Sequence, residues 1–189
     1  LERCCSRVVA IIRWKDDGDD SAATTFKWSV FVLAGDPQQT DDNKKGNING
    51  DAFGSPDGLW VDDSGYLWIQ TDVSTPRLSN NATLATPPTT PNPDYKNLGN
   101  NQMLMADPNT RKVKRFLVGP SQCEITGVHM TPDRKTMFLN IQHPGEDGSD
   151  GDLSATPKKF SSWPDGAAAG RPRSATIAIT RKDGGIIGT

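Results

Sequence analysis

Two short segments of the chain each place a carboxylate directly ahead of an apolar run. Residues 54–58 read Gly-Ser-Pro-Asp-Gly and carry Asp57, and residues 123–127 read Cys-Glu-Ile-Thr-Gly and carry Glu124. Carboxylate oxygens are the hard ligands that calcium prefers. A turn residue in a Pro-Asp-Gly corner is the more ordinary interpretation of Asp57. Turn chemistry gives no reason for a glutamate at position 124, where a metal ligand and a plain structural role both stay open.

Other side chains offer weaker chemistry. His143 ends a strand-like run, and with Glu146 it could supply an acid and a base or two metal ligands, although a single histidine is a weak signal. Cys123 could bind a soft metal as a thiolate, but a buried, inert thiol is the more common state. Arg171 and Arg173 could clamp a phosphate with their guanidinium groups, or simply be exposed charges. No phosphate loop, nucleophile elbow or metalloprotease motif is present, so no residue receives a catalytic role.

The elements that must position these residues are strands. Residues 8–14 and 28–34 are short β-branched runs, typical of strands. Apolar runs at 59–61 and 66–71 flank an Asp-Asp-Ser-Gly turn, and those at 102–106 and 112–118 flank an Asp-Pro-Asn-Thr turn. Each pair predicts a β-hairpin.

The hairpin pattern then repeats. Runs at 127–130 and 136–141 form a third hairpin, and residues 175–180 with the following turn begin a fourth. Gly58 aligns with Gly127 at a spacing of 69 residues, which puts Glu124 at the position of Ser55. We expect repeat units at about 55–118 and 124–189, with 1–54 as part of a preceding blade and loop.

Two hairpins per repeat make a four-stranded antiparallel unit, and radial repetition of such units gives a β-propeller. The fold class expected is therefore all-β: a partial propeller of about two complete blades and part of a third. A β-sandwich is the alternative. Because a ring of blades needs at least about four of them, we expect either a fragment of a longer protein or several copies that assemble. In such a ring the loops that enter the innermost strand of each blade converge at one mouth of the central channel, and Asp57 and Glu124 would face this mouth.

Composition narrows the function classes. The 189 residues carry 21 basic and 23 acidic side chains, and this balance argues against general nucleic-acid binding. No apolar run approaches the roughly 18–20 residues of a membrane span. The 18 glycines and 14 prolines favour turns and short strands. The first residues do not form a signal peptide.

Several strings, in order, resemble the C-terminal portion of the PhoX family of bacterial alkaline phosphatases. The resemblance runs from about residue 8 to residue 189. It is carried by residues 22–26, 31–37, 55–60, 67–72, 100–104, 123–127, 140–146, 161–166 and 170–176.

This resemblance implies a six-bladed propeller, phosphomonoester substrates, a calcium and iron cluster, and export to the periplasm or beyond the cell. It implies Asp57 and Glu124 as metal ligands and Arg171, Arg173 and His143 as weaker candidates for substrate contact. The family's metal-binding cysteine lies in an N-terminal part that this sequence lacks, so Cys123 is not its substitute. We therefore expect about half an active site, inactive without the remainder of the propeller or copies of the chain.

Two other functions remain open from the residues. A calcium-dependent lactonase on a propeller would keep the mouth carboxylates but hydrolyse a cyclic ester. A non-catalytic propeller would serve as a binding platform and would tolerate the loss of Glu124.

Overall fold

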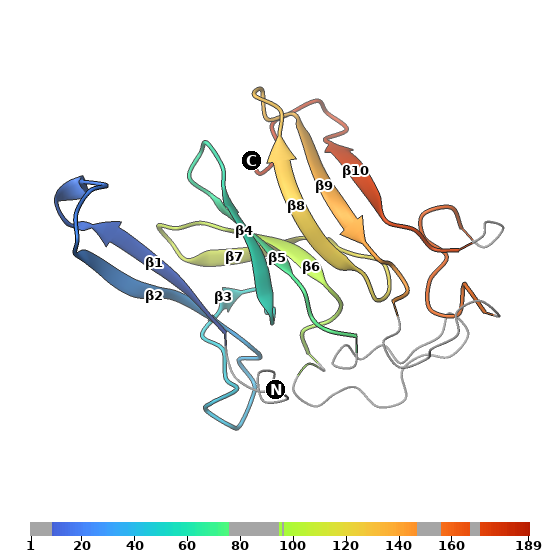
Figure 1. Ribbon diagram of the computed structural model, residues 1–189, viewed down its shortest axis with the longest axis horizontal. Coiled ribbons are helices and arrows are strands. Elements are labelled where there is room, and N and C mark those ends of the chain that lie inside the picture. The colour runs from blue at the N-terminus through green and yellow to red at the C-terminus, as the bar shows by residue number, and fades with distance from the viewer. Residues whose placement is uncertain (1–8, 76–94, 96, 147–155, 167–170) are drawn as a thin grey trace.

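The computed structural model describes residues 9–75, 95, 97–146, 156–166 and 171–189. Within these ranges the regular structure consists of strands and one 3-10 turn, η1 (Asp17–Asp19). The strands form three sheets side by side, each with a face toward its neighbour (Figure 1). The expectation of an all-β, partial propeller is confirmed.

The first sheet is a two-stranded hairpin. β1 (Val9–Asp16) pairs antiparallel with β2 (Phe26–Ala34), and the register shifts once, after Ile11. Both strands match β-branched and aromatic runs of the sequence. Ile11 and Phe31 are buried toward the middle sheet, which fixes the inner face of the hairpin.

The middle sheet holds the first two predicted hairpins in one antiparallel series. β4 (Pro56–Val61), β5 (Leu67–Thr71), β6 (Gln102–Ala106) and β7 (Lys112–Val118) follow in spatial order, and β3 (Asn49–Gly50) adds a short parallel edge on β7. Asp62 fixes the β4–β5 turn, because its Oδ1 accepts the backbone N–H groups of Ser64 and Tyr66. Its Oδ2 accepts the indole N–H of buried Trp68 at 3.0 Å.

The third sheet contains β8 (Glu124–Met130), β9 (Thr136–Gln142) and β10 (Ala175–Thr180). The sequence predicts a second complete blade, but the described residues form only three strands here. After β10 the chain turns back instead of adding a fourth strand. Ile187 is buried in the core between the sheets, and its N–H donates to the Arg134 carbonyl. In place of the two complete blades expected, the described residues form one four-stranded series and one three-stranded sheet.

Two apolar cores separate the three sheets. Ile69, Leu104 and Val113 of the middle sheet pack with the inner face of β1–β2. The opposite face of the middle sheet carries Trp68 and Met103, which pack with residues of β8 and β9. Strand residues alternate between these two cores, as the period-2 pattern of a doubly covered sheet requires.

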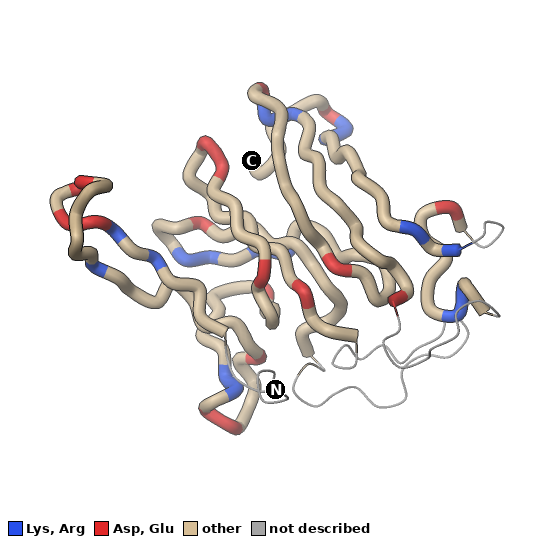
Figure 2. The backbone as a smooth tube through the Cα atoms, viewed as in Figure 1, with Lys and Arg blue, Asp and Glu red and all other residues tan. Residues whose placement is uncertain are grey.

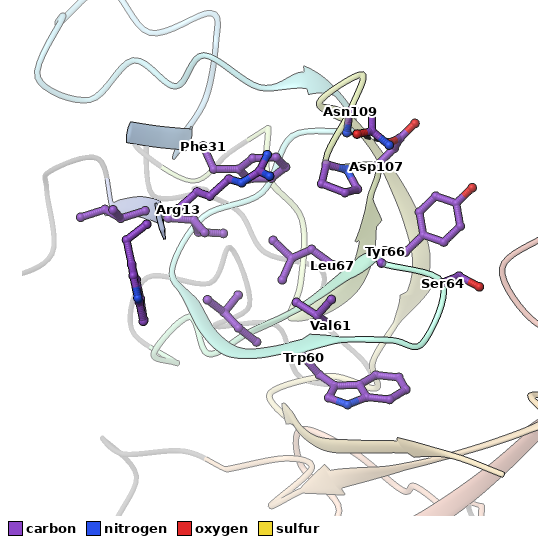
Figure 3. Close-up of a pocket in the computed structure, with 15 residues that line it drawn as sticks. Arg13, Phe31, Trp60, Val61, Ser64, Tyr66, Leu67, Asp107 and Asn109 are labelled. Carbon is purple, nitrogen blue, oxygen red and sulfur yellow. Dashed lines mark hydrogen bonds between the residues drawn. The ribbon is translucent and has the colours of Figure 1, made fainter. Parts of the chain in front are cut away.

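The flank of the molecule at β1–β2 carries exposed apolar side chains. Ile12, Trp14, Phe26 and Trp28 are each about half exposed or more, between 49% and 67%. Beside them a cavity of about 720 Å³ opens between β1–β2 and the turns of the middle sheet. Phe31, Val61 and Leu67 line it, while Trp60 points away toward the third sheet (Figure 3). An apolar surface of this kind indicates a place for further protein.

Candidate metal-binding mouth

β4 and β8 begin at the same end of their sheets, and their first residues carry the two predicted ligands. Asp57 is the second residue of β4 and is exposed, whereas Glu124 is the first residue of β8 and has a side chain only 13% exposed. Acidic residues gather at this end of the two sheets (Figure 2). The large cavity lies at the opposite end, beside the turn at Ser64, and is not part of this mouth.

β4 and β8 each contain a β-bulge just inside the mouth. The register shifts between Pro56 and Leu59 in β4, and between Thr126 and Val128 in β8. Each bulge contains the glycine on which the repeats were aligned, and each glycine lies against an amide side chain of the next strand. A Cβ on Gly58 would lie 2.5 Å from Gln70 Oε1, and one on Gly127 would lie 2.6 Å from Asn140 Nδ2. The two sheets thus share one local construction.

A third carboxylate, Asp72, joins the mouth immediately after β5. Partial desolvation raises the pKa of Asp72, and repulsion from Asp57 raises it further. Desolvation also raises the pKa of Glu124, followed by repulsion from Asp72 and, more weakly, from Asp57. His143 lowers both pKa values, because its electrostatic interaction favours the ionised form of each carboxyl group. The mouth is therefore an under-neutralised cluster of acids.

His143 lies at the centre of this cluster, directly after β9. Its Nε2 is 3.4 Å from Glu124 Oε2, and its Nδ1 is 3.4 Å from Glu146 Oε2. Cross-strand pairing explains the first contact, because Glu124 pairs with Gln142. The sequence paired His143 with Glu146 alone, and the structure adds Glu124.

Asn101 braces the backbone beneath the mouth. This side chain is 1% exposed, and its amide donates to the carbonyls of Val73 and Cys123 at 3.1 and 2.7 Å. Its oxygen accepts from the Thr71 hydroxyl and the Val73 N–H. The bonded residues flank Asp72 on both sides and precede Glu124, so one satisfied amide fixes the two acidic positions relative to each other.

The remaining candidates lie apart from the acids or are engaged elsewhere. Arg173 makes a two-point ion pair with Asp165, with N–O distances of 2.7 and 2.8 Å. Arg171 is exposed on the same segment, which approaches the mouth where Ser174 accepts the His143 N–H. Burial raises the pKa of the Cys123 thiol to about 12, so in the metal-free protein Cys123 is a buried, protonated thiol.

Among the described residues, no three acidic, histidine or cysteine side chains converge closely enough to enclose a metal ion. In the same part of the chain, no helix has the length and apolar character needed to cross a membrane.

Sequence reasoning missed Asp72 and Asn101. The signal for Asp72 was its position directly after the strand that pairs with residues 56–61. Its N–H bonds to the Ser55 carbonyl, which places it beside Asp57. No comparable signal marks Asn101, because an Asn-Asn pair before a strand is also typical of a turn.

Comparisons with known proteins were made by family, sequence and structure. The family model described as alkaline phosphatase PhoX matches residues 5–145. A search of curated protein sequences gave no match. A solved structure described as Pseudomonas fluorescens PhoX in complex with vanadate, a transition state analogue, matches with a TM-score of 0.75 and 44% identity. That match covers 95% of this chain but only 27% of the solved chain, so the chain spans about a quarter of its length.

Proposed function

This chain belongs to the PhoX family of alkaline phosphatases, and from that premise we propose that it forms one side of the active site of a metal-dependent phosphomonoester hydrolase. The observation that carries the proposal is the cluster of Asp57, Asp72 and Glu124 around His143, at the end where two adjacent inner strands begin. The vanadate bound by the Pseudomonas fluorescens protein supports phosphoryl transfer as the reaction.

The donor set of the mouth fits calcium. Its acids are oxygen ligands. Desolvation and then mutual repulsion raise the pKa values of Asp72 and Glu124, and a divalent cation would relieve the repulsion. Because the described residues do not enclose an ion, we infer that Asp57 and Glu124 supply part of a coordination shell completed by other blades. Iron, which the family resemblance implies, also takes carboxylate ligands in proteins, as in sites that combine histidines with a carboxylate.

Bound cations would polarise phosphate oxygens and stabilise the charge that develops in the transition state. The contribution of the chain itself is to hold the acids in place and to present cationic side chains. Arg171 is the freer candidate for phosphate contact, because Arg173 would first have to leave Asp165. Guanidinium groups match the geometry of phosphate oxygens.

The partner of this chain in our proposal is the remainder of the propeller. Ile12, Trp14, Phe26 and Trp28 expose an apolar face that a neighbouring blade would cover. Copies of the chain are the alternative partner. We place the enzyme in the periplasm or outside the cell, as the family resemblance implies.

The proposal is tested on the complete phosphatase that contains this chain. Activity is measured on p-nitrophenyl phosphate and on a lactone, and calcium content is measured by elemental analysis. Glu124→Gln and Asp57→Asn should lose calcium and lower phosphatase turnover by at least about 100-fold. Asp63→Asn is the matched control, because Asp63 is an exposed acid at the far end of β4.

Two results would overturn the proposal. Hydrolysis of the lactone in place of the phosphate ester would favour the lactonase. A complete protein that binds no calcium and hydrolyses neither ester would favour a binding platform.

A further inference from the structure

Two hydrogen bonds and a left-handed backbone conformation define the position of His143. Its N–H donates to Ser174 Oγ at 2.9 Å, and its carbonyl accepts the Glu146 N–H at 3.0 Å. Its φ of +36° lies in the left-handed region, which residues with a Cβ seldom adopt. These constraints hold the residue where β9 ends, and they aim its ring back across the start of β8.

The ring of His143 lies between two carboxylates. Nε2 faces Glu124 and Nδ1 faces Glu146, each at 3.4 Å, and Nδ1 is buried with no hydrogen-bond partner among the described residues. A carboxylate oxygen only accepts hydrogen bonds. A carboxylate oxygen therefore lies 3.4 Å from each ring nitrogen, whichever of them carries the hydrogen.

This arrangement does not suit direct contact with a phosphate. Both ring nitrogens already face anionic oxygens, and a phosphate brought to either would be repelled by Glu124 or Glu146. The arrangement does suit a role in orienting the side chain of Glu124. The contact of the ring with Glu124 is made at one carboxylate oxygen, Oε2.

We propose that His143 is a positioning residue: it holds the Glu124 carboxylate through Nε2 in the orientation that binds a calcium ion. This inference rests on the proposed function, since it requires that Glu124 is a calcium ligand. Hydrogen-bond partners of metal-ligating groups fix ligand orientation, and their loss typically costs roughly 10–100-fold in metal affinity.

Two conservative substitutions distinguish the role of Nε2 from that of Nδ1. The glutamine amide nitrogen reaches about as far as Nε2, whereas the asparagine amide nitrogen reaches about as far as Nδ1. Asparagine also tolerates a positive φ better than most residues, which favours folding of that variant. His143→Gln should keep calcium affinity within about threefold, and His143→Asn should weaken it roughly 10–100-fold.

The assay is calorimetric titration of calcium into the complete, metal-stripped phosphatase. His129→Ala is the control, because His129 is the other histidine of the chain and lies on β8, where its ring centroid is 6.2 Å from that of Trp60. It should leave calcium affinity unchanged. Thermal unfolding without metal is measured for each variant, so that a general loss of stability is distinguished from a loss of calcium binding. If His143→Asn fails to fold, His143→Ala is compared with His143→Gln in its place.

The outcomes separate this inference from its premise. Equal calcium affinity in the Asn and Gln variants, both near that of the unmodified protein, refutes the positioning role. Glu124→Gln is titrated in parallel. If it loses calcium while His143→Asn retains it, only the role of His143 fails. If Glu124→Gln binds calcium normally, the proposed metal site fails and the inference falls with it.

Discussion

Replacement of Gly127 by alanine tests whether the bulge in β8 sets the position of Glu124. Gly127 has a φ of +53°, and a Cβ there would lie 2.6 Å from Asn140 Nδ2. The left-handed backbone costs roughly 1–2 kcal/mol for a residue with a Cβ. The Asn140 amide can rotate away only by giving up the hydrogen bond from the Thr176 hydroxyl, worth about 0.5–1.5 kcal/mol. Together these predict a loss of about 1.5–3.5 kcal/mol in unfolding free energy.

Gly65→Ala is the matched control for this variant. Gly65 has a φ of +83° in the β4–β5 turn, and nothing lies within 4 Å of its added Cβ. It should therefore lose only the backbone part, roughly 1–2 kcal/mol. Urea unfolding of the complete protein measures both, provided that the dependence on denaturant stays the same. A Gly127 variant no less stable than the Gly65 variant would refute the role assigned to the Asn140 contact.

Calcium titration adds a functional measure to the same pair. Glu124 lies three residues before Gly127, so a distorted bulge should move its carboxylate and weaken calcium binding. The Gly65 turn lies at the far end of the sheet and should leave affinity unchanged. Equal affinity in both variants would show that the bulge does not position the glutamate.

Three further predictions concern the same end of the molecule. Because desolvation raises the pKa values of Glu124 and Asp72, the metal-free protein should lose stability as pH rises from their ordinary values, 4.5 and 3.8, through the raised ones. Calcium or Glu124→Gln should flatten this pH dependence of thermal unfolding, and an unchanged slope would contradict the prediction. Asn101→Ala should cost about 2–4 kcal/mol in urea unfolding, because it strands the Val73 and Cys123 carbonyls, and a loss below about 1 kcal/mol would show that the brace is dispensable. Arg171→Ala should lower kcat/KM on p-nitrophenyl phosphate by roughly tenfold or more, and unchanged steady-state kinetics would exclude phosphate contact.

The hairpins of the middle sheet were predictable because local patterns determine them. The turn at Asp62 to Gly65 combines side-chain acceptors with a glycine of positive φ, and apolar runs flank it on both sides. The end of the chain was not predictable in this way. Residues 184–189 have the composition of a strand after a turn, but Ile187 packs against the core around Trp68 instead. The packing of Ile187 depends on the space between two sheets, and no local sequence pattern predicts that space.

The mouth also combines features that local sequence patterns predict with features that depend on strand pairing. Asp57 and Glu124 could be identified because each precedes a repeated glycine. The contact of His143 with Glu124 depends on the β8–β9 register, which pairs Glu124 with Gln142. The sequence predicted the hairpin but not its register, because the bulge at Gly127 shifts the pairing by one residue.

The shared bulge also gives the mouth depth. Asp57 precedes its glycine by one residue, whereas Glu124 precedes its glycine by three, so the two acids are offset by two residues along equivalent strands. At about 3.3 Å per residue this offset is roughly 7 Å measured along the strand direction. The two sheets thus present their carboxylates at two different depths of the mouth. Cations bound there could lie at different depths, each in contact with a carboxylate from a different sheet.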